Sequence, residues 1–487
     1  MMPESLPAGA LSRRAVRLVA SALAALALAG CSAVGPAYRA PTAPLPPAYA
    51  GRVAHEGSTV DLVRWWQGFG DPQLAALIEE AQFGNPTVGQ AVARIAQARA
   101  LVTIAGAQLA PQLDARVGGS RATQFFFTGT GPTIVPATTI QAGLEASWEF
   151  DLFGRVLRGQ QAAAAQLEST ERNWHEARAS VAAEVARAYV QARACRARRD
   201  TLNQQLGSVR EDERIGALRA QAGRIASAEL AQTRASLAEV QARLADAQAR
   251  CSEADAALAE LTGQSVAQVG ERLSALPVAI PAFSGGPGEA VPADLLRQRP
   301  DVAAAERRLA AASARIGEAQ AAQYPSFSIT GALSLNRLSA LGQDVNYRSW
   351  SIAPGLRLPL LDGRRRRAQV EQREAEYQEA YEAYRAQVAR AVSETEAAIG
   401  DLAAARDRVV AVETAVREYD QFFRAEQARL RAGRTATVEV ERARRALLQA
   451  VAAEVDAREG LAVGWVRLYR ALGGGWQQAG TADTAAR

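Results

Sequence analysis

Few residues in this sequence could carry out chemistry. The 487 residues include two histidines, His55 and His175, and three cysteines, Cys31, Cys195 and Cys251. A metal centre or a nucleophile with its general base needs several such side chains close together. The sequence contains no motif that would assemble them. The composition therefore argues against an enzyme and predicts no metal site.

Cys31 is the cysteine whose neighbours predict a modification. The preceding region begins with three arginines: Arg13, Arg14 and Arg17. An apolar stretch follows at 18–28, which is too short for a membrane-spanning helix and has the length of a signal-peptide core. It ends in Leu28-Ala29-Gly30-Cys31, which resembles a bacterial lipobox. We expect residues 1–30 to be removed, and Cys31 to carry diacylglycerol and an N-acyl chain, which together anchor a protein firmly. The alternative is an ordinary signal peptide followed by a chance cysteine.

The amino-acid composition and the residue after the lipobox cysteine further restrict the class of protein. The chain has 56 basic residues, all arginine, against 51 acidic ones, and the small excess is spread along the sequence. No basic block of the kind that binds nucleic acid is present. The apolar fraction of 48% is too high for a disordered chain. Ser32, rather than Asp, follows the lipobox cysteine, which indicates sorting to the outer membrane.

Four long helices are predicted, at 155–220, 226–263, 365–431 and 436–473. None contains an internal proline, and their apolar residues recur at 4-3 spacing. Sustained repeats of this kind are typical of coiled-coil packing. A helix of about 65 residues is about 100 Å long, because each residue adds about 1.5 Å. Such helices span a distance rather than enclose an active site.

Two pairs of short strands are also predicted. One apolar face has Leu144, Ala146, Trp148, Phe150 and Leu152, and the other has Phe327, Ile329, Gly331, Leu333 and Leu335. Their expected partners are 113–117 and 350–360, with loops at 125–139 and 336–349. The alternation fits a soluble half-buried sheet or transmembrane strands. The pattern alone favours the soluble sheet, whereas the expected sorting to the outer membrane favours transmembrane strands. Four strands are too few to close a barrel, so in the membrane they would have to combine with the strands of other copies.

The two halves resemble each other. Leu152-Phe153-Gly154-Arg155 matches Leu361-Asp362-Gly363-Arg364, and Ala222-Gly223-Arg224 matches Ala432-Gly433-Arg434, at offsets of about 210 residues. We predict an extended anchored segment at 31–64 and a first repeat at 65–263. A linker rich in proline and glycine at 264–298, a second repeat at 299–474 and a disordered tail at 475–487 would complete the chain.

Several short motifs, in order, now carry a family resemblance. They are Val34-Gly35-Pro36-Ala37-Tyr38, Trp65-Trp66, Ala93-Arg94-Ile95, Trp148-Glu149-Phe150-Asp151-Leu152-Phe153-Gly154-Arg155, Arg299-Pro300-Asp301-Val302, Ala314-Arg315-Ile316-Gly317, Tyr324-Pro325-Ser326 and Leu361-Asp362-Gly363-Arg364. Over almost the whole mature chain the sequence resembles the TolC-like outer membrane factors, in the lipoprotein branch that serves RND efflux pumps (NodT/OprM-like). The resemblance implies an α+β membrane protein, a homotrimer with a twelve-stranded β-barrel and a helical periplasmic tunnel.

The resemblance also implies a function. The protein would be a passive efflux conduit that works with a periplasmic membrane-fusion adaptor and an inner-membrane RND-type pump. It implies no particular substrate. Two alternatives are the same kind of channel serving type I protein secretion, and a coiled-coil lipoprotein that tethers envelope layers without a pore.

Structural roles follow for the corners of the fold. Gly154 and Gly363 lie where a strand turns into a helix, where glycine tolerates the required dihedral angles. Pro111 and Pro325 would end helices and precede strands, where a missing N–H costs least. Ordinary loop positions are the alternative for all four residues.

The helix tips are the candidate functional residues. Gly223 and Gly433 interrupt the helix pairs, and each is followed by an arginine, Arg224 or Arg434. The resemblance makes these tips the adaptor-docking surface. A helix C-cap glycine with a solvated arginine is the alternative.

Six residues after each tip glycine lies a carboxylate, Glu229 or Glu439. The resemblance implies rings of these carboxylates at a periplasmic constriction, which would attract cations. A glutamate that complements a helix dipole is an equally good interpretation. Arg442, one turn beyond Glu439, would pair with it within the helix or with a neighbouring chain.

The remaining two cysteines lie at the same height on the expected antiparallel helices. Residue 223 is midway between Cys195 and Cys251, and both cysteines lie on apolar seams. Because the compartment is oxidising, we hypothesise a disulfide. Two small buried thiols are the plainer interpretation.

Overall fold

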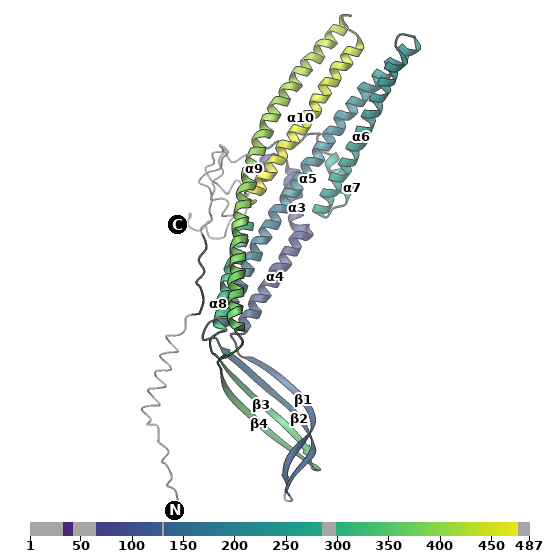
Figure 1. Cartoon of the computed structure of the whole chain (residues 1–487). Helices are drawn as coiled ribbons and strands as arrows, with labels where there is room; N and C mark the ends of the chain where they lie inside the picture. The colour runs from purple at the N-terminus through teal and green to yellow at the C-terminus, as the bar shows by residue number, and fades with distance from the viewer. Residues whose placement is uncertain (1–32, 42–64, 129–130, 285–298, 476–487) are drawn as a thin grey trace, which may run out of the picture. The chain divides into compact units, whose positions relative to one another are not determined.

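The computed structural model describes residues 33–41, 65–128, 131–284 and 299–475 (Figure 1). The predicted signal peptide, Cys31, most of the segment at 31–64, and the tail after residue 475 lie outside these residues. The chain divides into two compact units, and each unit contains segments from both predicted repeats. The sheet unit comprises 33–41, 95–169 and 305–384, and the hairpin unit comprises the other described residues.

The four predicted long helices are confirmed. They are α5 (Arg155–Gln221), α6 (Ser227–Thr262), α9 (Arg365–Arg431) and α10 (Thr437–Ala471), each ending within two residues of its expected bounds. Shorter helices include η1 (Trp65–Phe69), α3 (Pro72–Gly84), α4 (Pro86–Ala107) and α8 (Pro300–Ala321). Among the described residues, no helix is long and apolar enough to cross a membrane.

The predicted linker at 264–298 is not wholly irregular. It contains the helix α7 (Val266–Ser274), which opens with a capping box formed by Ser265 and Gln268. Val269 and Leu273 lie one turn apart on this helix and are buried. The density of proline and glycine farther along the segment hides this short helix in the sequence.

A four-stranded antiparallel sheet forms the core of the sheet unit. Its strands are β1 (Gln112–Thr128), β2 (Gly131–Phe150), β3 (Ser326–Ala340) and β4 (Gln343–Arg357), in the order β1-β2-β3-β4. The loops predicted at 125–139 and 336–349 are wrong, because most of these residues continue the strands. Pro132 and Pro136 suggested a turn, but they lie before Thr138, where pairing of β2 with β3 begins. There β2 pairs on one side only, and proline is tolerated at an unpaired edge.

The two faces of the sheet have opposite chemistry. The register places Trp148 opposite Ile329, and Leu144 opposite Leu333, which collects the predicted apolar residues on one face. This face is exposed in the single chain: Val117 is 80% exposed, and Trp350 77%. On the other face Asn336 and Ser334 are buried and hydrogen-bonded to each other and to Ser349. A soluble sheet buries its apolar face, so this arrangement favours a sheet that faces lipid.

An aromatic cluster forms part of the core of the hairpin unit. Trp65 and Trp66 of η1 pack on Tyr469 of α10, with ring centroids 5.9 and 4.5 Å away. Phe283 lies 4.3 Å from Trp465 and 5.0 Å from Trp65. This contact fixes both η1 and the end of the described linker against the long helix α10.

Candidate functional site

Both hairpin tips have the same backbone geometry. Gly223 and Gly433 adopt φ angles of 65° and 67°, in the left-handed region that favours glycine. The N–H of Arg224 donates to the carbonyl of Arg219 at 2.8 Å, and that of Arg434 donates to Arg429 at 2.8 Å. These are the bonds of a Schellman motif, in which a left-handed residue closes a helix. Each glycine has open space around its Cα, so the turn itself requires it.

The two candidate pore carboxylates occupy equivalent positions just beyond these tips. Glu229 and Glu439 lie in the first turns of α6 and α10, whose N-caps, Ala226 and Ala436, make no side-chain hydrogen bond. Glu439 pairs with Arg442 of the same helix at 2.9 Å. The structure thus contains the ion pair within the helix, which is one of the two pairings predicted for Arg442. Complementing the helix dipole is also consistent with both positions.

A cleft between the two hairpins contains one of these carboxylates. Its volume is about 300 Å³, and Glu229, Arg442, Arg219, Asp212 and Arg445 contribute to its walls. Glu439 is not among the lining residues, although its partner Arg442 is. The cleft therefore joins charged groups from both predicted repeats within a single chain.

Below the tips, ionic contacts join the two hairpins. Arg445 of α10 forms an ion pair with Asp212 of α5, whose side chain is only 10% exposed. The hydroxyl of Ser208 on α5 donates to the buried carboxylate of Glu441 on α10. These contacts could not be predicted from the sequence, because the partners are more than 200 positions apart in the chain. No local pattern distinguishes these residues from the other charged and polar residues of the helices.

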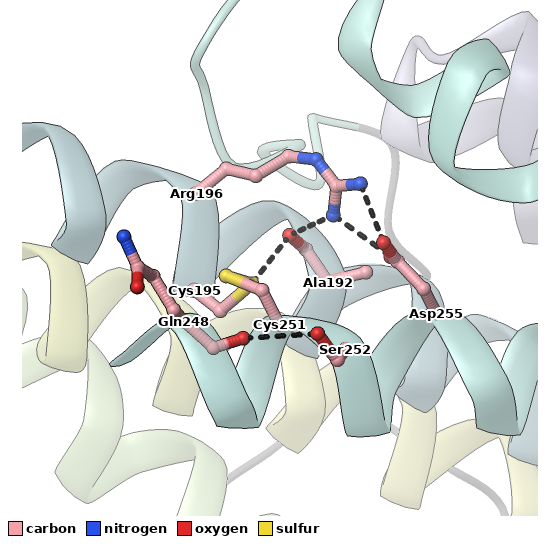
Figure 2. The surroundings of a disulfide bond; sticks show 7 residues. All are labelled: Ala192, Cys195, Arg196, Gln248, Cys251, Ser252 and Asp255. Atoms are coloured by element: carbon pink, nitrogen blue, oxygen red, sulfur yellow. Dashed lines mark hydrogen bonds and ion pairs between the residues drawn. A yellow bond between two sulfur atoms is a disulfide. The ribbon is translucent and has the colours of Figure 1, made fainter. Parts of the chain in front are cut away.

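Cys195 and Cys251 form a disulfide between α5 and α6 (Figure 2). Their Cα atoms are 5.4 Å apart, and both side chains are buried. Arg196, the next residue, donates twice to the carboxylate of Asp255, at 2.9 Å each (Figure 2). A covalent bond and a bidentate ion pair, one turn apart on α6, therefore fix the register of the first hairpin.

The strand–helix corners differ from each other. Pro111 and Pro325 directly precede β1 and β3, as predicted. Gly154 (φ 78°) directly precedes α5, and it lies against Ala33, where an added Cβ would be 2.5 Å from the Ala33 Cβ. Gly363 (φ 63°) has open space around it and is followed by Arg364, which is also left-handed at φ 70°. The second corner is longer than predicted, since β4 ends at Arg357 and α9 begins at Arg365.

These differences predict unequal effects of the same substitution. Gly363→Ala should cost about 1–2 kcal/mol, because alanine pays only for the left-handed conformation. Gly154→Ala should cost more, since its Cβ also displaces Ala33, whose neighbour Val34 donates its N–H to the Phe153 carbonyl at 3.0 Å. Thermal unfolding of the two variants in one detergent would compare them. Equal losses of stability would contradict a packing role for Gly154.

A buried ionic cluster occupies the start of α8. The guanidinium of Arg299, a residue only 4% exposed, contacts Asp301 at 2.7 Å, Glu394 at 2.8 Å and the Ala471 carbonyl at 2.9 Å. Burial, reinforced by the charge of Asp301, raises the pKa of nearby Glu176 to about 7. Arg299 and Asp301 belong to the Arg-Pro-Asp-Val motif, whose structural role could not be predicted from the sequence.

The described residues contain no group of three or more histidine, cysteine or acidic side chains placed to hold a metal ion. The ring of His175 packs against that of Trp174, with centroids 4.7 Å apart and ring planes tilted by 59°. Burial, followed by the charges of Arg178 and Arg172, lowers the pKa of His175 to about 4. The side chain is therefore neutral at neutral pH and packs as an aromatic ring.

Comparison with known proteins gives consistent matches over most of the chain. The sequence profile of the outer membrane efflux protein family matches residues 77–264 and 291–474. Outer membrane protein OprJ of Pseudomonas aeruginosa is 29% identical over 94% of this chain and 96% of its own. The pyoverdine export outer membrane protein OpmQ of Pseudomonas putida is 30% identical over 85% and 88%. The structure of the outer-membrane channel OprN superposes with a TM-score of 0.78 at 29% identity, covering 91% of this chain and all of the other.

Proposed function

The chain belongs to the outer membrane efflux protein family, and we propose from this membership that three copies assemble into one passive conduit. Its fold is that of the TolC-like outer-membrane channels, and its function is that of the outer-membrane component of a tripartite efflux system. The family is not a class of enzymes. Energy for transport would come from an RND-type pump in the inner membrane, and a periplasmic adaptor would connect the two.

The observation that carries this proposal is the exposed apolar face of an open sheet. Among the residues that the structure describes, β1 pairs with β2 alone and β4 with β3 alone, so each outer strand of the single chain has an unpaired edge. In lipid, unpaired backbone groups are costly, and closed barrels avoid them. Pairing β1 of one copy with β4 of the next satisfies both edges. Three copies would close a twelve-stranded barrel, with the apolar face toward lipid and the Asn336 face toward the lumen.

The N-terminal lipid would lie at the membrane end of the helices. Residues following Cys31 are held at the first corner, where the Arg158 Nε donates to the Val34 carbonyl at 3.1 Å. Only Ser32 lies between Cys31 and Ala33, and an extended chain covers at most about 3.6 Å per residue. A diacylglycerol on Cys31 would therefore enter the leaflet beside the β2–α5 corner. No cofactor beyond this covalent lipid is proposed.

At the opposite end of the helices, we assign Glu229 and Glu439 to the constriction and the Gly223 and Gly433 tips to adaptor docking. Three copies of each carboxylate in a narrow aqueous pore would attract cations and repel anions. Their mutual repulsion would also favour protonation. Support for this assignment comes from their equivalent positions in the first turns of α6 and α10.

Conductance of the purified mature trimer in planar bilayers tests the proposal. The wild type should give low, cation-selective conductance. Glu229→Ala/Glu439→Ala should raise the conductance and bring the reversal potential in a KCl gradient close to zero, because the fixed negative charge is lost. Glu239→Ala/Glu418→Ala removes two exposed carboxylates away from the tips and should leave both readouts unchanged.

The outcomes separate the channel from its gate. If Glu229→Ala/Glu439→Ala leaves the conductance unchanged, the protein is still a channel, but its constriction is formed by other residues. Intact trimers without conductance would reject the conduit and favour a structural tether.

A further inference from the structure

The two hairpin tips carry arginines at equivalent positions. We define the tip segments as residues 214–228 and 424–438. Together they contain seven arginines and one carboxylate, Glu426, and further carboxylates lie just outside them, among them Glu211, Glu229, Asp420 and Glu439. Six of the arginines form equivalent pairs at an offset of 210 residues. These pairs are Arg214 and Arg424, Arg219 and Arg429, and Arg224 and Arg434.

Only three of the seven are neutralised within the described structure. Arg214 pairs with Glu211 at 2.6 Å, Arg424 with Asp420 at 2.7 Å, and Arg429 with Glu426 at 2.8 Å. The other four form no ion pair with the residues that the structure describes. They are Arg219, which is half-buried, and Arg224, Arg431 and Arg434, which are exposed.

Helix electrostatics do not account for the two arginines at the turns. Arginines in the last turn of a helix, such as Arg219, complement the negative end of the helix dipole. Arg224 and Arg434 instead lie past those ends, three residues before α6 and α10 begin. A cation is disfavoured there, because the N-terminal end of a helix is positive. A favourable interaction with a helix dipole therefore does not explain these two guanidinium groups.

We propose that the tips recognise their adaptor by charge, and that the adaptor's docking surface carries clustered aspartate and glutamate side chains. The inference rests on the proposed function, which places the adaptor at the tips, and it adds the chemical identity of the partner surface. A free guanidinium binds a carboxylate through two parallel hydrogen bonds, which gives orientation as well as attraction. Because both tips present the same pattern, an acidic surface can bind either hairpin in an equivalent way. Complementary charge would also accelerate association at low salt.

The test uses the full-length trimer in nanodiscs and three synthetic helical hairpins. They are identical except that the turn carries glutamates, glutamines or lysines at the same positions. The glutamate hairpin should bind the wild type, and its affinity should fall as salt rises from about 0.05 to 0.3 M, since the Debye length shortens over this range. Arg224→Gln/Arg434→Gln should weaken binding about tenfold, the effect expected for two lost exposed pairs. Arg243→Gln/Arg408→Gln removes the same charge from exposed positions elsewhere on α6 and α9 and should change binding less than twofold.

Charge reversal provides the decisive comparison. Arg224→Glu/Arg434→Glu should no longer bind the glutamate hairpin and should bind the lysine hairpin. Equal binding of glutamate and glutamine hairpins to the wild type would overturn the proposal, as would equal losses in the tip and control variants. If phosphatidylglycerol vesicles bind the wild type with the same dependence on Arg224 and Arg434, the tips are a lipid-binding patch instead. Channel conductance measured on the same samples separates this proposal from the proposed function. A trimer that conducts but does not bind the glutamate hairpin would contradict the acidic docking surface and leave the channel function intact.

Discussion

Removing the Cys195–Cys251 disulfide is expected to destabilise the folded chain by about 4 kcal/mol. The bond closes a loop whose ends are 56 residues apart, and the chain-entropy model of cross-links gives about 4 kcal/mol for a loop of this length. Cys195→Ala/Cys251→Ala should therefore lower the melting temperature by several degrees. Far-UV circular dichroism of the trimer in one detergent, with and without a reductant, would measure the shift.

Two controls make this result specific. The reductant should lower the melting temperature of the wild type and leave that of Cys195→Ala/Cys251→Ala unchanged. Alkylation of the unfolded chain without reductant, followed by mass spectrometry, should find neither cysteine labelled. Labelling of both would show two buried thiols and contradict the disulfide.

Arg299→Met is expected to cost about 3 kcal/mol, because it leaves partly buried carboxylates without their cation. Arg299 is 4% exposed and contacts Asp301, Glu394 and the Ala471 carbonyl, so no water replaces it readily. Methionine keeps much of the volume and removes the charge. Arg467→Met is the matched control, because Arg467 and its partner Asp401 have side chains 65% and 57% exposed. Exposed pairs of this kind contribute about 0–1 kcal/mol.

The pH dependence of Arg299→Met identifies the cause of the loss. Without Arg299, the pKa values of Asp301 and Glu176 rise above those of the unfolded chain, because burial of both carboxyl groups is no longer opposed by the Arg299 charge. The folded variant then binds more protons, so its stability relative to the wild type should increase as pH falls. In the wild type the pKa of Glu176 is already raised to about 7 by burial. A deficit that is constant between pH 8 and about pH 5 would indicate lost packing rather than uncompensated charge.

The long helices could be predicted from the sequence because their signal is local. A 4-3 apolar repeat without proline extends between glycines that end a helix, and α5, α6, α9 and α10 follow those bounds within two residues. The face of each strand was equally clear, since alternation along β2 and β3 specifies which side chains share a face. Strand lengths were not predictable, because Pro132 and Pro136 indicate a turn unless it is known that the neighbouring strand stops short of them.

The candidate site shows the same division. The tip glycines, their arginines and the two carboxylates were identified from repeated spacing, and the structure places them in equivalent turns. Cys195 and Cys251 could be placed at one height, but only the packing of α5 on α6 brings their Cα atoms within 5.4 Å.

The helices, the apolar and polar faces of the strands and the repeated tips are predictable from the sequence, because each depends on residues close together in the chain. The ionic contacts are set by tertiary packing. Arg445 forms an ion pair with Asp212, and Arg299 with Glu394, because helices from different parts of the chain pack side by side. The physical reason is that an isolated charged residue on a helix has many potential partners. The three-dimensional packing selects one of them and buries the pair.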